Sequence, residues 1–400
     1  MDGRSRIVSK INIGGIELDG KVLSAPFSGI SNSPFRVLAR QHGASLVFTE
    51  MVKANAWLIF KNRPDRNKAG HMVSFKPEER PVFAQIASGD PDEAAEATEL
   101  AFASGFDGID LNMGCPVKKM TKSKCGAYLM SDPELAGEVL GAMERTAAGL
   151  RTSARPFPVT AKIRAGLSSD RVNAPEIARR LRQNGCAALI IHARTKDQIH
   201  SGETKWKVAK EVKESLDIPI FYNGSINSPQ IARRAVELSG CDGVMIGRAS
   251  FGNPWVFGRV ERYLSQDRLE TAAPTIGEVK ETLIWHFGAV RGLFGDHLAS
   301  RMMRRYGCWY IHGVKGGAKF RYAMSRLESA DQFEELVEDL FGRFDPALPA
   351  PLADWYDAAS LSRHEGVGAG TVTAGAARET NPDPDRPRRR DDPTSAPFAD

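Results

Sequence analysis

Short apolar runs alternate with amphipathic segments through most of this 400-residue chain. Eight of the runs resemble buried strands, and they recur roughly every 30 residues, a spacing typical of β/α units. They cover residues 22–25, 46–49, 81–85, 108–111, 158–162, 188–192, 218–222 and 243–247. Several intervening segments begin with Ser, Asp or Asn close before Pro, which is typical of the first turn of a helix. Eight such units predict a TIM, or (β/α)8, barrel.

An open, doubly wound parallel sheet is the alternative. It is disfavoured because no Gly-x-Gly-x-x-Gly motif follows the first strand. Before that strand, residues 11–18 are expected to form a hairpin that turns at Gly14 and Gly15.

The alternation of strand-like and helix-like segments ends after residue 264. Residues 275–294, 297–307 and 331–344 are expected to be helices without strands between them, and so to form a small helical domain. From residue 362 onward almost no large apolar side chains occur, so a disordered C-terminal tail is expected. The predicted division is a barrel domain at 1–270, a helical domain at 271–345, and a linker and tail at 346–400.

Basic residues are concentrated in the predicted helical domain. The whole chain has a formal net charge of +5, whereas residues 291–326 contain eight Lys or Arg and one carboxylate. These residues are Arg291, Arg301, Arg304, Arg305, Lys315, Lys319, Arg321 and Arg326, against Asp296. Such clustering favours a polyanionic partner, although a solvated helix face is the simpler alternative.

The five cysteines are scattered, and no two of them form a Cys-x-x-Cys pair. This argues against a disulfide framework and against a zinc or iron–sulfur centre, so no metal is expected. The first residues lack the apolar core of a signal peptide, and no apolar run reaches about 18 residues. A cytoplasmic protein with no membrane partner is therefore expected.

Polar side chains follow six of the predicted strands at their carboxyl ends. They are Gln85, Asn112 with Cys115, Lys162 with Arg164, His192, the turn Asn223-Gly224-Ser225, and Gly247-Arg248. Barrels of this kind bind ligands at the carboxyl rim, so a binding site is predicted there. The turns after the last two strands suit a phosphate, because they present backbone N–H groups, a hydroxyl and a guanidinium. Lys162 can either stabilise negative charge on a bound ring, such as a reduced flavin, or form an ion pair across the barrel mouth.

Cys115 follows the fourth predicted strand, which Gly114 and Pro116 bring to an end. A thiol at that rim can meet a ligand. A free cysteine is also often only a small buried apolar group, and this segment alone leaves both interpretations open.

Several of these segments together resemble the tRNA-dihydrouridine synthases, over roughly residues 22–341. The segments are 25–30, 34–36, 49–51, 85–89, 110–116, 162–164, 191–195, 223–226 and 246–249. The combination of Asn112-Met113-Gly114-Cys115-Pro116 with His192-Ala193-Arg194-Thr195 is the most specific part. The flavin segments alone would also suit other FMN barrels, such as dihydroorotate dehydrogenases.

The resemblance implies an FMN enzyme that reduces the C5=C6 bond of particular tRNA uridines, with NADPH or NADH reducing the flavin. Cys115 is implied as the general acid. The implied FMN contacts are Pro26, Gln85, Lys162, His192, Asn223, Gly224, Gly247 and Arg248. The implied substrate contacts are Asn112 and Arg164 in the barrel, and Arg304, Arg305 and Arg321 on phosphates of tRNA. A monomer is expected.

The chemistry suits these residues. Conjugation with the C4 carbonyl makes uracil C6 electrophilic, so hydride is expected at C6 and a proton at C5. An unperturbed thiol has a pKa of about 8.5 and is mostly protonated at neutral pH, so Cys115 can donate without special activation.

Two residues depart from the family pattern after Cys115. Tyr128 is bulkier than the residue expected there, and Cys125 is a second thiol near the site, interpreted as structural. Two other functions remain open: a small-molecule FMN oxidoreductase that does not need the helical domain, and a non-catalytic RNA-binding protein that has kept the barrel.

Overall fold

The structure, a computed structural model, describes residues 10–62, 70–270, 272–311 and 317–350. Its main sheet is parallel throughout, and a bridge between Leu23 and Leu46 joins the two ends of the strand path. The path contains β3 (Val22–Ser24), β4 (Val47–Phe48), β6 (Val82–Ala87), β7 (Gly108–Asn112), β8 (Val159–Gly166), β9 (Ala188–Thr195), β10 (Ile220–Asn223) and β11 (Gly243–Ile246), and β5 (Val52–Lys53) pairs with β6 beside it. The predicted TIM barrel is therefore confirmed.

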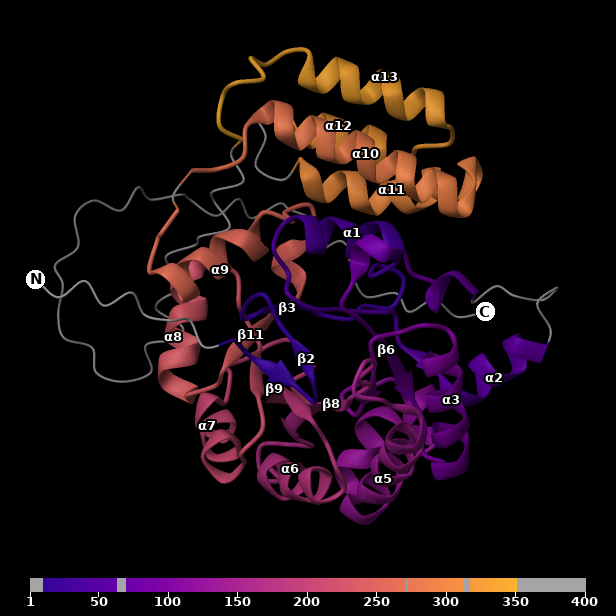
Figure 1. Cartoon of the computed structure of the whole chain (residues 1–400). Coiled ribbons are helices and arrows are strands. Elements are labelled where there is room, and N and C mark those ends of the chain that lie inside the picture. The colour runs from indigo at the N-terminus through magenta and orange to yellow at the C-terminus, as the bar shows by residue number, and fades with distance from the viewer. Residues whose placement is uncertain (1–9, 63–69, 271, 312–316, 351–400) are drawn as a thin grey trace, which may run out of the picture. The chain divides into compact units, whose positions relative to one another are not determined.

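Helices surround the barrel (Figure 1). They are α1 (Ser33–Gln41), α2 (Ala54–Asn62), α3 (Pro91–Ala103), α5 (Pro133–Leu150), α6 (Ala174–Gln183), α7 (Trp206–Ser215), α8 (Pro229–Ser239) and α9 (Val256–Gln266). Shorter helical turns are α4 (Lys118–Lys122), η2 (Gly70–Met72), η3 (Pro77–Glu79), η4 (Gly126–Ser131) and η5 (Arg248–Ser250). Asp90, Asp132 and Ser228 each accept a backbone hydrogen bond as an N-cap and are followed by proline, as predicted. At α1 the cap is Asn32, which precedes Ser33 and Pro34.

Strand β8 shows how alternation positions polar groups. Val159, Ala161 and Ile163 belong to the apolar core between the strands and the outer helices. Side chains in a strand point alternately to its two faces, so Thr160, Lys162 and Arg164 face the barrel interior. Lower in that interior lies a separate apolar cluster, which includes Leu23, Phe48, Phe83, Phe221 and Met245. The same alternation thus buries one face of each strand and directs polar groups toward the barrel mouth.

The predicted hairpin is present as β1 (Asn12–Ile13) and β2 (Ile16–Glu17), which pair antiparallel. Ile13 and Leu18 are buried in the apolar cluster inside the barrel. Gly14 has φ +53, and a Cβ there would lie 2.8 Å from the Cβ of Pro158. The hairpin therefore closes the amino end of the barrel and leaves the carboxyl end as the mouth.

A layer of four helices packs beside α1 (Figure 1). They are α10 (Ile276–Phe294), α11 (Asp296–Tyr310), α12 (Gly317–Met324) and α13 (Ala330–Phe341). Helix α12 was not predicted, because eight residues are too few to show a helical period. The layer shares its apolar core with Ile30 and Phe35 of the barrel.

The barrel and the helical layer group into one compact unit. The domain boundaries at residues 270 and 345 therefore stay a prediction. The predicted disordered tail lies outside the described residues from residue 351 onward.

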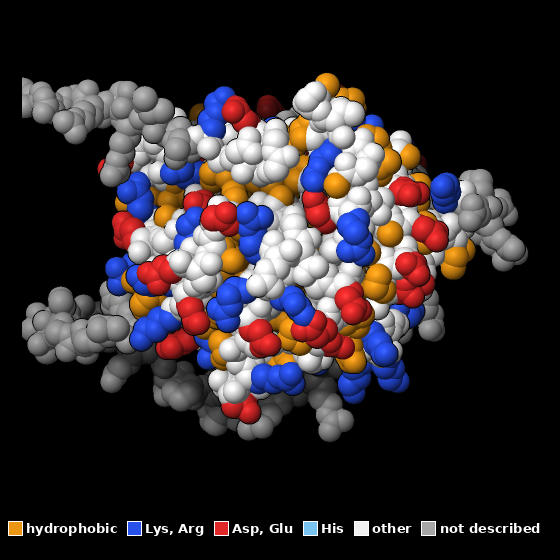
Figure 2. Space-filling view, turned by 60° about the horizontal axis from the view of Figure 1, so that its bottom comes forward, with side chains coloured by type: hydrophobic (Ala, Val, Ile, Leu, Met, Phe, Trp, Pro, Cys, Tyr) orange, Lys and Arg blue, Asp and Glu red, His pale blue; other side chains and the backbone are white. Residues whose placement is uncertain are grey.

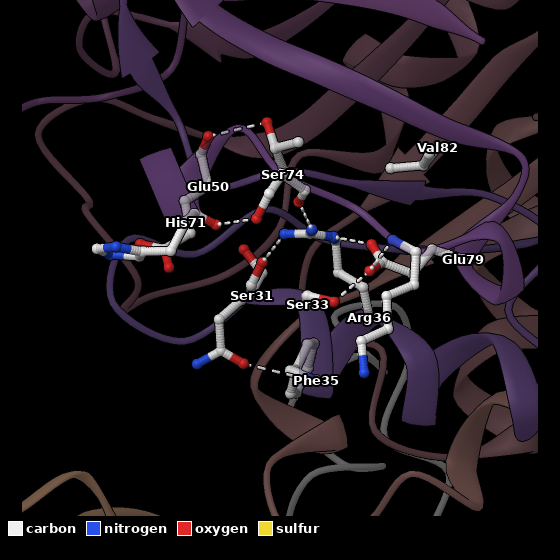
Figure 3. A network of polar contacts seen from close by, with 12 residues as sticks. Ser31, Ser33, Phe35, Arg36, Glu50, His71, Ser74, Glu79 and Val82 are labelled. Atoms are coloured by element: carbon white, nitrogen blue, oxygen red, sulfur yellow. Dashed lines mark hydrogen bonds and ion pairs between the residues drawn. The ribbon is translucent and has the colours of Figure 1, made fainter. Parts of the chain in front are cut away.

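A buried ion pair joins α1 to the segment before β6 that contains Ser74 and Glu79 (Figure 3). Arg36 Nε lies 2.6 Å from Glu79 Oε2, and both side chains are fully buried. The guanidinium also donates to the carbonyl oxygens of Ser31 and Ser74, and Ser33 donates to Glu79. Five polar groups are thus satisfied together, as a buried charge pair requires. The network holds the segment after β3, part of which borders the barrel mouth.

Basic and acidic side chains are interspersed over the face in Figure 2, and neither sign predominates among the residues described there. Ion pairs such as Arg182–Asp217 and Lys210–Glu214 are largely exposed, so they contribute little to stability. Among the described residues, no helix combines the length and the apolar character that crossing a membrane would require.

Candidate active site

A pocket of about 900 Å³ lies at the carboxyl ends of the barrel strands. Eleven of the sequence-predicted site residues line it: Pro26, Gln85, Asn112, Cys115, Lys162, Arg164, His192, Asn223, Gly224, Gly247 and Arg248. These residues come from β3, β6, β7, β8, β9, β10 and β11 or the loops that follow them. Because alternate side chains of these strands face the barrel interior, residues far apart in the sequence come together at one cavity.

Cys115 is partly exposed in this pocket and is a free thiol. Its carbonyl oxygen accepts a hydrogen bond from the Ala127 amide at 2.9 Å. Gly126 has φ +63, and a Cβ there would lie 2.9 Å from that same oxygen, so only glycine fits comfortably. Burial raises the pKa of the Cys115 thiol above its ordinary value. The loop therefore holds a protonated thiol at the cavity edge at neutral pH.

The second thiol, Cys125, is buried beside Ala87 and Met120 in a small cluster against which Cys115 packs. Its sulfur donates to the Met120 carbonyl oxygen at 3.2 Å. These contacts give Cys125 the environment of a structural cysteine.

Four side chains form a hydrogen-bonded chain from β8 to β6 and β7, and two of them, Gln85 and Asn112, line the pocket. Thr160 Oγ1 donates to Asp110 at 2.7 Å, and Gln85 Nε2 donates to the other oxygen of Asp110 at 2.8 Å. Asn112 Nδ2 then donates to Gln85 Oε1 at 2.9 Å. Asn112 Oδ1 accepts from the backbone amide of Cys115 at 3.0 Å. The chain thus connects a fully buried carboxylate to the loop of the thiol.

Lys162 projects from β8 into the pocket. Its ammonium has no ion pair or hydrogen bond in the part of the chain that the structure describes, so the alternative of an ion pair across the mouth is wrong there. Burial, and next the nearby Arg164, lower the pKa of Lys162 to about 8. An unpaired cation in a pocket wall favours a ligand that carries negative charge.

His192 lies on β9 and is 8% exposed. Burial, followed by the positive charges of Lys162 and Arg164, holds its pKa far below the ordinary value for histidine. The imidazole is therefore neutral, with one nitrogen that donates and one that accepts.

Arg164 lines the pocket, but its guanidinium is engaged in holding loops. It donates to the carbonyl oxygens of Gly114 at 2.7 Å and of Thr195 and Ile199 at 3.0 Å. Burial lowers its pKa to about 10, so it remains charged at neutral pH. The structure thus brings Arg164 to the cavity in a bracing position, and its predicted substrate contact stays a prediction.

The turns after β10 and β11 supply free backbone donors. The N–H groups of Gly224 and Arg248 donate to no other group among the described residues. Gly224 has φ +139, and a Cβ there would lie 3.2 Å from Thr204. Arg248 begins η5 with an exposed guanidinium. This corner of the pocket suits a phosphate, which binds backbone N–H groups at such turns.

Sequence reasoning missed several residues in and beside the pocket. Arg194 lies on β9 two residues after His192, so both side chains face the pocket. Its guanidinium donates to the carbonyl oxygen of Gly202 at 2.8 Å and to Ser225 Oγ at 2.7 Å. The alternation of β9 was the signal that could have identified it.

The loop after Cys115 carries a group of lysines that was also missed. Lys118, Lys119, Lys122 and Lys124 are exposed there, and Lys53 Nζ donates to Ser123 Oγ in the same loop at 2.8 Å. We refer to these five as the rim lysines. Within the described ranges none of them forms an ion pair. Their dense spacing in the sequence was the available signal.

The three predicted tRNA-contacting arginines lie outside the pocket lining. Arg304 Nε donates to the Leu327 carbonyl oxygen at 2.8 Å, and Arg321 donates to that of Ile311 at 3.4 Å. Arg305 reaches the barrel, where it donates to the Gly29 carbonyl oxygen at 2.7 Å. Each guanidinium keeps further donors, so the predicted phosphate contacts remain predictions.

The pocket wall contains four cationic side chains, Lys162, Arg164, Arg194 and Arg248, and one carboxylate, Glu203. Its free donors are backbone N–H groups at one corner and an ammonium deeper inside. This arrangement fits a ligand with a phosphate at one end and a flat ring with carbonyl oxygens at the other. Fold and pocket together define an α/β-barrel protein with a cationic pocket at its carboxyl rim, which suits an anionic ligand.

Comparison with known proteins agrees with this geometry. The family model "Dihydrouridine synthase (Dus)" matches residues 23–344. The chain is 35% identical to tRNA-dihydrouridine synthase B of Xanthomonas campestris pv. campestris over 344 residues, which cover 86% of this chain and 99% of that protein. The protein of the same name from Pseudomonas aeruginosa is 35% identical over 324 residues, covering 81% and 93%. The chain belongs to the dihydrouridine synthase family.

The similarity of this chain to solved structures is weaker. Histamine dehydrogenase from Rhizobium sp. 4-9 aligns with 70% of this chain and 50% of its own, with 13% identity and a TM-score of 0.49. The family assignment therefore depends on the sequence relatives.

Proposed function

We propose that this protein reduces the C5=C6 bond of specific uridines in tRNA to give dihydrouridine, with FMN as its cofactor and NADPH or NADH as the reductant. The observation that carries the proposal is a protonated thiol, Cys115, at the edge of a cationic pocket in the barrel mouth. Membership of the dihydrouridine synthase family supports the same reaction.

FMN would lie in the pocket with its phosphate at the turns after β10 and β11. Gly224, Gly247 and the Arg248 guanidinium would bind that phosphate, beside Asn223. Lys162 and the neutral His192 would contact the ring, together with Gln85 and Pro26 of the pocket lining. When bound and reduced, FMN supplies a hydride to C6 of the uridine.

The protein supplies the proton. Since burial raises the pKa of the Cys115 thiol, the sulfur holds its proton through the neutral range and can release it to C5. Arg164 holds the Gly114 carbonyl oxygen, and Gly126 lets the following loop approach Cys115 closely. These contacts fix the position of the thiol before substrate binds, which is how positioning contributes to rate.

A tRNA would contact the rim lysines and the basic surface of the helical layer. The rim lysines support this because four of them are exposed on the loop after Cys115, Lys53 is half-buried and bonded to the same loop, and none carries an ion pair among the described residues. Arg304, Arg305 and Arg321 would add phosphate contacts through their remaining donors. The uridine must leave its stack to reach a pocket inside a barrel. We also propose a monomeric, cytoplasmic enzyme.

Replacing Cys115 with Ala tests the function, and Cys125→Ala is the matched control. We expect the Cys115 variant to keep bound flavin, visible as yellow absorbance, and to lose most dihydrouridine formation, roughly 100-fold or more for loss of a general acid. Dihydrouridine in tRNA is measured by mass spectrometry. The Cys125 variant should retain activity.

Undiminished turnover without Cys115 would contradict its role. Efficient reduction of a free pyrimidine nucleoside, with no reaction on tRNA, would instead favour a small-molecule oxidoreductase. A colourless protein that still binds tRNA would favour a non-catalytic RNA-binding protein.

A further inference from the structure

Asp110 is the most deeply buried carboxylate near the pocket, and the proposed reaction does not use it. It lies on β7 with no exposed surface, and its neighbours across the strands are Gln85 and Thr160. Both of its oxygens accept hydrogen bonds from these neighbours. The positive charge of Lys162 acts on it, but the two side chains form no hydrogen bond or ion pair in the described part of the chain.

The direction of each hydrogen bond follows from chemistry. An ionised carboxylate only accepts, so Gln85 must turn its NH₂ group toward Asp110. Gln85 Oε1 then faces Asn112 and can only accept, so Asn112 must turn its NH₂ group toward it. Asn112 Oδ1 is thereby left to accept from the amides of Gly114 and Cys115, at 3.1 and 3.0 Å.

The directions of these hydrogen bonds also determine which donor groups face the pocket. Gln85 Nε2 and Asn112 Nδ2 each use one hydrogen within the chain, and the second hydrogen of each donates to no group among the described residues. Both side chains line the pocket. Two donors side by side in the wall suit the carbonyl oxygens of a flat heterocycle.

We propose that Asp110 is a positioning residue: its buried carboxylate sets the orientation of the Gln85 and Asn112 amides, which hold the Cys115 loop and present two N–H donors to the pocket. The proposal rests on the proposed function in its second part, because the donors gain their purpose from a carbonyl-bearing ring. Its first part, the hold on the Cys115 loop, is independent of the reaction.

The informative variant is Asp110→Asn, which keeps the size of the side chain. The amide of Asn can donate as well as accept, so it also supports the reversed chain in which Gln85 turns over. A neutral acceptor is also weaker than a charged one. The Gly114 and Cys115 amides should then exchange with solvent deuterium about fivefold faster than in the wild type.

Thr160→Val is the matched control. It removes the other hydrogen bond to the same carboxylate but leaves Gln85 facing a charged acceptor. We expect exchange at Gly114 and Cys115 to stay at the wild-type rate in this variant.

The experiment is hydrogen exchange followed by mass spectrometry on the full-length protein as purified, with steady-state kinetics on tRNA alongside. Faster exchange limited to the peptide around Cys115, with kcat lowered about fivefold and KM for tRNA nearly unchanged, would support the proposal. Unchanged exchange in that peptide, or faster exchange throughout the protein, would overturn it. If the exchange result holds but no tRNA activity exists in any variant, the proposed function fails while the hold of Asp110 on the loop stands.

Discussion

The burial of Asp110 makes its charge costly, and this cost can be measured. Burial raises the pKa of Asp110 from 3.8 to about 6, even though Gln85, Thr160 and Lys162 each act to lower it. The folded protein therefore binds this proton more tightly than the unfolded chain does. Stability from this group is fully present at pH values below 3.8 and is lost as the pH rises through 6.

The magnitude follows from linkage. With pKa values of about 6 folded and 3.8 unfolded, ionising Asp110 costs about 3 kcal/mol at pH 7.5 and about 1 kcal/mol at pH 4.5. The amide that replaces this carboxyl group in the Asp110→Asn variant does not titrate. The free energy of unfolding of the variant, minus that of the wild type, should therefore rise by about 2 kcal/mol between pH 4.5 and 7.5.

Urea unfolding of both proteins at several pH values tests this. Asp217→Asn is the control, because Asp217 is exposed and its hydrogen bond with Arg182 lowers its pKa. The free energy of unfolding of this variant, minus that of the wild type, should therefore not rise with pH. If the difference in unfolding free energy between Asp110→Asn and the wild type did not change with pH, the wild-type Asp110 carboxylate would not be held in the dry environment that the structure gives it. A rise would show that the barrel retains a charge that reduces its stability, as functional sites often do.

Three further outcomes are expected. Glu79→Gln leaves the buried guanidinium of Arg36 without its counter-charge and should cost about 3 kcal/mol in urea unfolding, so an unchanged midpoint would refute the ion pair. Gly126→Ala places a Cβ against the Cys115 carbonyl oxygen in left-handed backbone and should cost about 1 kcal/mol and slow turnover; full activity would contradict this. Lys162→Met should weaken FMN binding about tenfold in a flavin titration, and wild-type affinity would exclude an ionic contact.

The barrel could be predicted because its signals are local. The strands of the barrel path are apolar runs, and five of the outer helices (α1, α3, α5, α6 and α8) begin at Ser, Asp or Asn with a proline in the first turn. The element order therefore required little knowledge of contacts. The rim residues followed, since parallel strands in a closed barrel end at one face and eleven of the predicted residues line one pocket. Helix α12 was missed because its eight residues are too few to show a period.

The use of each polar group could not be predicted in the same way. Arg164 and Lys162 are both cations two residues apart on β8, yet Arg164 braces three carbonyl oxygens while Lys162 has no partner among the described residues. Arg305 belongs to the basic window of the sequence, but its guanidinium donates to Gly29 of the barrel. Spacing in the chain does not reveal which acceptor a long side chain will reach.

The sequence by itself determined the barrel, the face on which polar residues gather, and the thiol at the end of β7, because periodicity, capping and strand order depend on neighbours in the chain. Only the tertiary structure decided which donors are consumed and which stay free for a ligand. It alone connected the buried Asp110 to Cys115 through two amides. Hydrogen bonds join atoms brought together from separate strands, so their partners and directions exist only once the barrel has closed.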